Sequence, residues 1–540
     1  MVISDRGIVA TSQTLASQAG AQVLARGGSA IDAAIAADAV LGVVEPMSCG
    51  MGGDLFALYW DARTGKLTGL NASGWSPQAL TPELLHARGS STMPQAGIHS
   101  VTVPGCVNGW SKLHQRFGKL PWGELFQPAA YYAEHGFPVT ELIQGGWRNS
   151  LNTLNADENA RRVFLRDGSA PEIGEMFRNP QLAAALKLVA AGGAKVFYRG
   201  PIAKAILRTS DRLGGTLAAA DLSEFDAEWV DPVSTEYRGW KVYELPPNGQ
   251  GVAALEMLNI MSNFPLFNYP ARGLEELHIQ IEAQKLAYAD LARYVADPRF
   301  SRVPVEGLLA PAYARRRAEL IRMDAARCTA EPGHPPPTAG DTIYLSVVDR
   351  DGNIVSLIQS LYLSFGSGVM VEGYGFHLHN RGALFTLDPQ HPNVLAPRKR
   401  PFHTIIPAFM EKDNVHMGFG IMGGFNQAQA HAQFVGNIVD HSMNIQAALE
   451  APRFTKLNFG GCDLMIENRV PPEVREALEA RGHRLQVLGD FSTEVGGGQA
   501  VIHDSRTGVN YGASSPRKDG AAVPEPHPYF PPRARPAARK

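Results

Sequence analysis

Cysteine is scarce in this chain of 540 residues. Only four occur, and no two of them stand in a C-x-x-C pattern. Cysteines at such spacings form neither a disulfide framework nor a common zinc site, so we expect reduced thiols in the core. The four are Cys49, Cys106, Cys328 and Cys462.

An excess of charge of one sign is lacking too. The 50 Lys and Arg nearly balance the 52 Asp and Glu, which leaves a net charge of −2. Such a chain has no electrostatic footprint for nucleic acid or for an anionic membrane surface, so we expect neither as a partner. A hydrophobic content of 44% excludes a disordered chain, and the length predicts two or more domains or one large intertwined domain.

Long apolar runs are missing as well. The most apolar early run, residues 30–44, is too short to span a bilayer and contains Asp32 and Asp38. Residues 1–7 lack the charged segment followed by an apolar core that marks a secretory signal. We therefore expect a soluble, cytoplasmic protein.

Helical patterns, glycine loops and one proline-rich break organise the rest of the sequence. Residues 331–340 contain four prolines, which predicts an exposed linker. An Asp-Gly turn signal at 351–352 lies between two β patterns, which predicts a hairpin. Proline-rich residues from about 522 to 540 predict a disordered tail. The pattern predicts helices over 12–25, about 30–41, 180–191 and about 274–295, and strands over 55–60, 343–348 and 354–359.

The join between this linker and the hairpin carries a candidate nucleophile, Thr342. A threonine hydroxyl needs a neighbouring base, and an N-terminal threonine has one in its own α-amine, which titrates near pH ~7.7–8. That chemistry requires a cut before Thr342. Spacing alone leaves an ordinary strand threonine as the alternative.

A series of motifs occurs in chain order between about residue 7 and residue 520: 27–34, 42–46, 246–251, His278 with Glu282, Lys285 and Asp290, 342–353, 365–368, 400–404 and Gly423-Gly424. Together these motifs resemble the γ-glutamyltransferase (glutathione hydrolase) family. The resemblance implies an N-terminal-nucleophile (Ntn) hydrolase with an α+β fold, a four-layer αββα sandwich. It also implies a proenzyme cleaved between Asp341 and Thr342 into two intertwined subunits, a large one of residues 1–341 and a small one of residues 342–540. We expect these to associate as a heterodimer or as a dimer of heterodimers.

The rest of the candidate site follows from the hairpin and from the glycines. A turn at 351–352 brings Thr342 opposite residues 360–361, so we expect Ser360 within hydrogen-bonding reach of its hydroxyl. Gly423 and Gly424 open a helical run, where free backbone N–H groups can hold an oxyanion, and the resemblance implies that role.

Departures from the family pattern concern the substrate. No arginine stands near Ser73, and Leu384 replaces the aspartate that would pair with a substrate ammonium. Tyr362 stands in place of an asparagine, and His403-Thr404 replaces a serine pair. We therefore predict that Arg381 binds the carboxylate of a small amide, of oxamate or glutaryl type, with a structural ion pair as the alternative reading of Arg381.

Several other functions remain to be weighed. A glutathione hydrolase or γ-glutamyl transpeptidase is the first alternative, and an inactive binding homologue is the second.

Residues 418–423 fit G-x-G-x-x-G with Asp440 downstream, but no second half of a dinucleotide fold follows. His377 and His379 would share a strand face without a further ligand, which favours packed histidines over a metal site. We expect no cofactor and no metal.

Overall fold

Two seven-stranded sheets form the centre of the protein in a computed structural model that describes residues 1–330 and 341–529. All strand pairs within these two sheets are antiparallel. The first sheet has the order β1 (Val2–Ser4), β18 (Val509–Ser514), β17 (Gly498–Asp504), β13 (Val415–Ile421), β12 (Ala408–Lys412), β9 (Trp240–Glu244) and β8 (Val233–Tyr237). The second has the order β19 (Ala521–Pro524), β2 (Ile8–Thr11), β10 (Asp341–Val348), β11 (Ile354–Tyr362), β3 (Asp54–Asp61), β4 (Lys66–Ala72) and β7 (Glu228–Val230).

The two sheets pack against each other through apolar side chains. Phe56, Tyr344 and Ile358 of the second sheet and Phe409 and Val501 of the first belong to one buried cluster. The sheets come so close that a Cβ at position 420 of β13 would lie 2.5 Å from the ring of Tyr344. This contact fixes the position of β10, whose first residues carry the candidate nucleophile.

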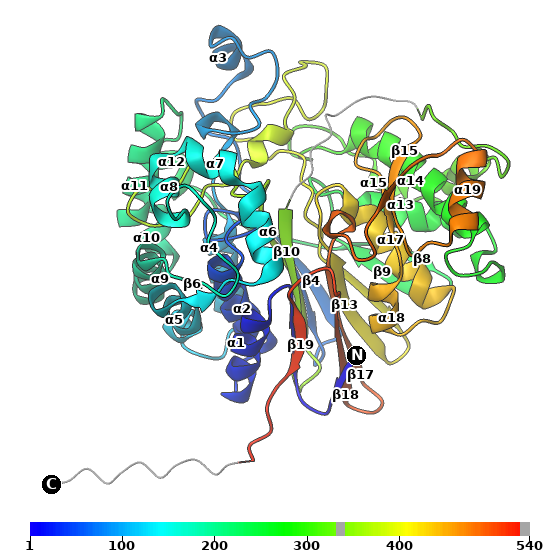
Figure 1. Cartoon of the computed structure of the whole chain (residues 1–540), viewed down its shortest axis with the longest axis horizontal. Helices are drawn as coiled ribbons and strands as arrows, with labels where there is room; N and C mark the ends of the chain where they lie inside the picture. Colours follow the sequence, from blue (N-terminus) through cyan, green and yellow to red (C-terminus); the bar gives the residue numbers. More distant parts are fainter. Residues whose placement is uncertain (331–340, 530–540) are drawn as a thin grey trace.

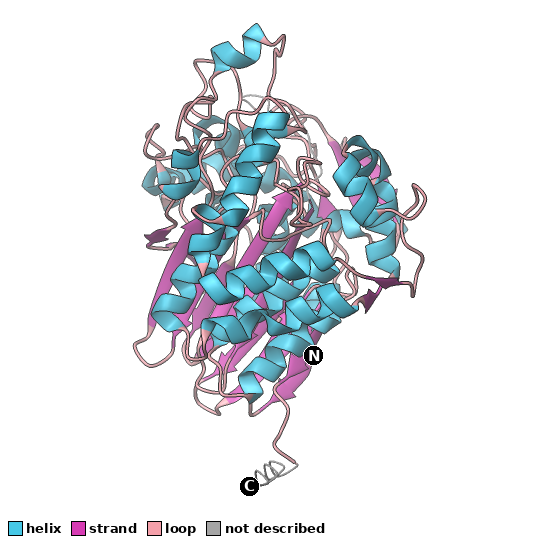
Figure 2. Cartoon of the chain, turned by 90° about the vertical axis from the view of Figure 1, so that its left-hand side faces the viewer, coloured by secondary structure: helices cyan, strands magenta, loops and turns pink. Residues whose placement is uncertain are grey.

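Helices cover the outer face of each sheet (Figure 1). Outside the second sheet they form one large core, and Figure 2 shows these helices lying across the strands. The members nearest the sheet include α1 (Thr14–Ala25), α2 (Ala30–Val44) and α4 (Cys106–Phe117), and α5 (Gln127–His135) packs on α2. Outside the first sheet a separate core contains α13 (Gly251–Met261), α14 (Leu274–Tyr294) and α17 (Asn426–Val439).

Shorter elements surround this frame. A three-stranded sheet contains β14 (Phe454–Thr455), β15 (Asp463–Glu467) and β16 (Arg484–Leu488), and β5 (Phe137–Pro138) pairs with β6 (Met176–Phe177). The remaining helices are α3 (Pro82–Ala87), α6 (Glu141–Asn149), α7 (Leu151–Ala156), α8 (Glu158–Phe164), α9 (Pro180–Gly192), α10 (Ala194–Tyr198), α11 (Pro201–Arg212), α12 (Ala219–Ser223), α15 (Val305–Leu308), α16 (Pro311–Ala318), α18 (Ile445–Glu450) and α19 (Pro472–Ala480).

Most elements predicted from the sequence are present, with ends that differ by a few residues. The predicted helices correspond to α1, α2, α9 and α14, the predicted strand over 55–60 to β3, and the predicted hairpin to β10 and β11. The predicted linker, 331–340, lies outside the described residues. Among the helices that are described, none is both long and apolar enough to cross a membrane.

Two expectations need correction. Cys328 and Cys462 form a disulfide across 134 residues of sequence, so they are not reduced thiols; Cys49 and Cys106 are buried and free. Spacing could not reveal that pair, because packing of distant segments brings it together. The predicted tail begins too early, since Ala521–Pro524 pairs with β2 and Glu525 is buried. The glycine motif at 418–423, for which the sequence already disfavoured a dinucleotide fold, begins on the antiparallel strand β13, which is inconsistent with such a fold there.

Candidate active site

The hairpin of β10 and β11 positions the candidate nucleophile. Thr342 lies at a bulge, because the register shifts by one residue between the pairs Asp341–Tyr362 and Ile343–Gln359. Its hydroxyl oxygen is 3.2 Å from that of Ser360, and both side chains are buried. The Ser360 hydroxyl also accepts a hydrogen bond from the N–H of Tyr362 at 2.8 Å. Bulges are frequent next to active sites, where they redirect a side chain.

The glycine pair lies between β13 and α17. Gly423 and Gly424 have φ values of +114° and +59°, a left-handed conformation that favours glycine. Their carbonyl oxygens accept hydrogen bonds from the N–H groups of Asn426 (2.9 Å) and Gln427 (3.3 Å). Within the described part of the chain neither glycine N–H donates a hydrogen bond. Gly423 is partly exposed and its N–H is therefore available to an anion, whereas Gly424 is buried.

Thr342 and Gly423 line one open cleft, with a volume of about 1590 Å³ including its open side. Its rim is polar and carries charges of both signs. One of these charges is already paired, since Lys518 lies 2.7 Å from the carboxylate of Glu45. The charged side chains of the cleft are Glu45, Glu141, Arg148, Glu494, Lys518 and Asp519. The cleft can therefore admit a polar amide and water to the hydroxyl of Thr342.

A fully buried carboxylate, Asp54, lies next to this hairpin, because it is the β3 partner of Ser360. Its Oδ2 is 2.8 Å from His403 Nε2, 3.4 Å from His379 Nδ1 and 3.4 Å from Arg381 Nε. Burial alone would raise the pKa of Asp54, but His379, His403 and Arg381 lower that pKa to about 2. Burial and the charge of Arg381 lower the pKa of His403 to about 3, so His403 is neutral and donates to Asp54.

Arg381 begins the 3₁₀ turn η4 (Arg381–Leu384) and is completely buried. Its Nη1 donates to the hydroxyl of Thr404 at 2.7 Å, and its guanidinium lies 4.7 Å from the ring centre of Tyr362. Burial lowers the pKa of Arg381 to about 10, so the side chain stays charged. Among the described residues its Nε and Nη2 have no hydrogen-bond partner.

The predicted residues thus fall into two groups. Thr342 and Gly423 line the cleft, with Ser360 directly behind Thr342. Arg381, Tyr362, His403 and Thr404 form a buried cluster around Asp54. Asp54 was not predicted from the sequence, and His379 was predicted only as a packed histidine and not as a neighbour of Asp54. The local signal for Asp54 is a carboxylate at the start of a mostly apolar strand.

Two groups of histidines bear on metal binding. His377 and His379 lie in an irregular segment instead of the predicted strand, and His379 Nε2 is 3.0 Å from the carbonyl oxygen of Thr102. His278, Glu282 and His483 bring three potential ligand atoms within 4.8 Å of one another. Several of these atoms already have partners, however, since Lys285 donates to Glu282 at 2.6 Å and His278 Nδ1 lies 2.9 Å from His483 Nε2. The positive charge of the Lys285 ammonium repels a metal cation at this position, which opposes metal binding.

The fold and the site together define a class. Two packed antiparallel sheets with helices outside, and a hydroxyl-bearing residue at the start of a central strand, are features of Ntn-hydrolase-type proteins. The family model named Gamma-glutamyltranspeptidase matches residues 16–525, and this chain belongs to that family. The family predicted from the sequence motifs is thereby confirmed.

Relatives with several different activities are similar to this chain over nearly its whole length. The glutathione hydrolase-like YwrD proenzyme of Bacillus subtilis is 36% identical over 527 residues, covering 97% of this chain and 99% of the relative. The oxamate amidohydrolase proenzyme of Klebsiella pneumoniae is 34% identical over 531 residues, covering 96% and 99%. The crystal structure of cephalosporin acylase from Bacillus halodurans matches with a TM-score of 0.91 and 43% identity, covering 97% and 96%. The chain is accordingly a hydrolytic enzyme of this family.

Proposed function

We propose that the chain is a self-processing amidohydrolase that uses Thr342 as its nucleophile. It cleaves itself between Asp341 and Thr342 on a four-layer αββα scaffold, giving a large subunit (1–341) and a small subunit (342–540). The observation that carries this proposal is the 3.2 Å approach of the Thr342 and Ser360 hydroxyls beside Gly423 in one cleft. The proenzyme names of the relatives support it.

Cleavage creates the base that the hydroxyl lacks. The Thr342 hydroxyl attacks the carbonyl carbon of Asp341, and the peptide C–N bond breaks, which frees the α-amine of Thr342. Water then hydrolyses the resulting ester, which releases the new carboxylate of Asp341 and restores the Thr342 hydroxyl. The α-amine, with a pKa near ~7.7–8, then accepts the hydroxyl proton when Thr342 attacks a substrate amide. The oxyanion receives hydrogen bonds from the N–H groups of Gly423 and Gly424, each donor being worth ~2.7–4 kcal/mol. The protonated amine leaves, and water releases the acyl group as a carboxylic acid.

The substrate we propose is the amide of a small carboxylate-bearing molecule. Arg381 is a buried cation whose Nε faces Asp54 at 3.4 Å and whose Nη2 has no hydrogen-bond partner among the described residues, and a carboxylate oxygen would satisfy Nη2. Leu384 closes the same turn and cannot pair with a substrate ammonium, which speaks against a free α-amino acid end. Tyr362, His403 and Thr404 hold or flank the guanidinium. Oxamate-type and acylase-type amides fit this pattern better than γ-glutamyl compounds.

The Thr342→Ala variant tests the proposal. Purified wild-type protein should run under reducing conditions as bands of about 341 and 199 residues, and Thr342→Ala as one band of 540 residues without activity. Ammonia release from a panel of small amides should exceed p-nitroaniline release from γ-glutamyl-p-nitroanilide. The opposite ranking would favour a glutathione hydrolase or transpeptidase. A wild-type chain that stays uncut and inactive would favour the binding homologue.

A further inference from the structure

The disulfide between Cys328 and Cys462 has its two ends in different surroundings. Cys462 is completely buried, whereas Cys328 is exposed. The ammonium of Lys285, on α14, donates a hydrogen bond to the sulfur of Cys462 at 3.7 Å and another to Glu282 Oε1 at 2.6 Å. One sulfur of the bond therefore belongs to a residue that reagents in solution can reach, and the other lies beside a buried cation.

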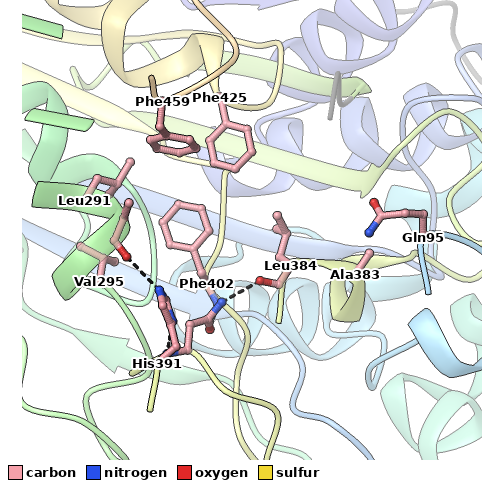
Figure 3. A pocket seen from close by; sticks show the side chains of 11 residues that line it. Gln95, Leu291, Val295, Ala383, Leu384, His391, Phe402, Phe425 and Phe459 are labelled. Carbon is pink, nitrogen blue, oxygen red and sulfur yellow. Dashed lines mark hydrogen bonds between the residues drawn. The ribbon is translucent and has the colours of Figure 1, made fainter. Parts of the chain in front are cut away.

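The loop that carries the buried cysteine is held in place by its own side chains. The ammonium of Lys456 donates to the carbonyl oxygens of Gly460 at 2.6 Å and of Asp463 at 3.0 Å. Phe459 packs edge-on against Phe425, with ring centres 5.0 Å apart, in the aromatic wall of a cavity (Figure 3). The loop cannot bring its cysteine to the surface without breaking these contacts, so this sulfur stays shielded.

The charges around this loop favour an anionic sulfur. Lys285 and Lys456 bring two ammonium groups to it, against one buried carboxylate, that of Glu282. The neighbouring His483 adds no charge, because burial and the charge of Lys285 lower its pKa to about 2. A nearby positive charge lowers the pKa of a cysteine thiol, and a thiol of lower pKa leaves a disulfide faster. Cys462 is therefore the better leaving group of the pair.

Backbone hydrogen bonds keep Cys328 beside its partner. The N–H of Arg327 donates to both carboxylate oxygens of Glu282, at 3.2 and 3.1 Å. The N–H of Gly461 donates to the carbonyl oxygen of Cys328 at 3.0 Å. These contacts do not involve the sulfur atoms, so they hold Cys328 next to Cys462 when the S–S bond is open.

We propose that Cys328 is a site of reversible S-thiolation by low-molecular-weight thiols, with Lys285 placed to stabilise the Cys462 thiolate that leaves. A thiolate attacks the sulfur of Cys328 and forms a new S–S bond, while the bond to Cys462 breaks and its electron pair goes to the Cys462 sulfur. This exchange needs no oxidant and no further co-reactant. In the reverse step the Cys462 thiolate attacks the modified Cys328 and expels the thiol.

This modification goes beyond the proposed function, because it requires no hydrolysis. In the proposed two-subunit enzyme the exchange opens and closes the covalent link between the subunits, since Cys328 lies before the cleavage site and Cys462 after it.

Brief exposure of the purified protein to millimolar mercaptoethanol, followed by alkylation with iodoacetamide and peptide mass spectrometry, tests the site. Among molecules with one adduct, mercaptoethanol should be on Cys328 and the alkyl group on Cys462, in about tenfold or greater excess over the reverse pattern. Peptide mapping locates both groups whether or not the chain has cleaved itself, so the outcome is independent of the proposed function. An adduct on Cys462 in equal or larger amount, or a bond that does not exchange under these conditions, would overturn the proposal.

The variant Lys285→Gln tests the part of the ammonium. Its disulfide should open at least about fivefold more slowly than that of the wild type, as followed by the appearance of alkylated Cys462. Lys399→Gln is the matched control and should open at the wild-type rate. The Lys399 ammonium is also buried, but it donates to the carbonyl oxygens of Pro392 and Val394 and, within the described chain, to neither cysteine.

Equal opening rates for Lys285→Gln and the wild type would refute the role of Lys285. Should Lys285→Gln fail to fold, the position of the adduct in the wild-type protein still decides whether Cys328 is the modified residue.

Discussion

Arg381 is the residue on which substrate recognition depends in our proposal, and its setting dictates how it can be tested. Removal of the side chain would leave the Asp54 carboxylate buried without its cation, which is strongly destabilising. Arg381→Lys keeps the charge but loses the planar fork. We expect KM for a carboxylate-bearing amide to rise at least tenfold, with kcat within about threefold and self-cleavage intact.

A matched control is available in Arg272, another buried arginine that is paired with a carboxylate, that of Glu276. Arg272→Lys should lower the Tm by a similar amount and leave KM unchanged. If Arg381→Lys also changed only the Tm, Arg381 would be a structural ion pair and the carboxylate would bind elsewhere.

Asp38 makes stability depend on pH. This carboxyl lies in α2, fully buried, with one oxygen bonded to Trp110 Nε1 at 2.7 Å. Burial, partly offset by that bond, raises the pKa of Asp38 from 3.8 to about 7. Between these values unfolding releases a proton, so stability falls as pH rises from about 4 to about 7 and then levels off, a loss on the order of a few kcal/mol.

The variant Asp38→Asn removes this titration while it can keep the contact with Trp110. Its Tm relative to wild type should increase from pH 4.5 to pH 7.5 and stay constant above that, as followed by thermal unfolding in matched buffers. Asp226→Asn, at an exposed aspartate, serves as the control and should show no such trend. Parallel Tm curves for Asp38→Asn and wild type would contradict the buried, protonated state.

Residues of the site could be predicted where the information is local. The distance along one hairpin placed Ser360 opposite Thr342, and a glycine pair before a helical run indicated free N–H groups. The cluster that His379, Arg381 and His403 form around Asp54 could not be found in this way, because these residues lie hundreds of positions from Asp54 in sequence. The Cys328–Cys462 pair was missed for the same reason.

At the scale of elements, Gly53 determines how closely the glycine loop approaches β11. A Cβ at this position would lie 2.4 Å from the carbonyl oxygen of Ser360 and 2.6 Å from the side-chain nitrogen of Gln359. Gly53→Ala must therefore push β11 away from β3 at the position of Ser360. We expect a loss of about 1–3 kcal/mol of stability and at least a tenfold slower self-cleavage, measured by denaturant unfolding and by gel.

The corresponding control is Gly307→Ala, where the added Cβ would meet only one atom, at 3.9 Å. This variant should process at the wild-type rate and unfold at an equal or slightly higher denaturant concentration. Normal processing in Gly53→Ala would show that the position of β11 is not what aligns the two hydroxyls.

Helices and hairpins, like these site residues, could be predicted because their signals lie within short stretches of sequence. Helical sequence patterns that end at glycines predicted α1 and α2. The Asp-Gly turn signal predicted that β10 pairs with β11. The order of strands in the sheets was beyond reach, since β2 pairs with both β10 and β19, elements from the beginning, middle and end of the chain. The misplaced tail boundary has this origin, because the strand β19 exists only through its pairing with β2.

At the scale of the whole molecule, the disulfide connects the two subunits of the proposed mature enzyme. Cys328 precedes the cleavage site and Cys462 follows it, so cutting the chain at residue 341 leaves the pieces covalently joined. The segments are also in backbone contact, with the N–H of Gly461 donating to the carbonyl oxygen of Cys328 at 3.0 Å. The link keeps the large and small subunits at high effective concentration after the peptide bond is lost.

Gel electrophoresis of protein purified in air, with free thiols blocked, checks this arrangement. Without reductant the wild type should run as one species of full mass, and with reductant as two bands. Cys462→Ser should give two bands in both lanes, whereas Cys49→Ser should behave like wild type, because Cys49 is a free buried thiol. Two wild-type bands without reductant would mean that the subunits are held by packing alone. A single wild-type band under reducing conditions would instead mean that the chain is not cleaved. The gel therefore distinguishes a missing disulfide from missing self-cleavage.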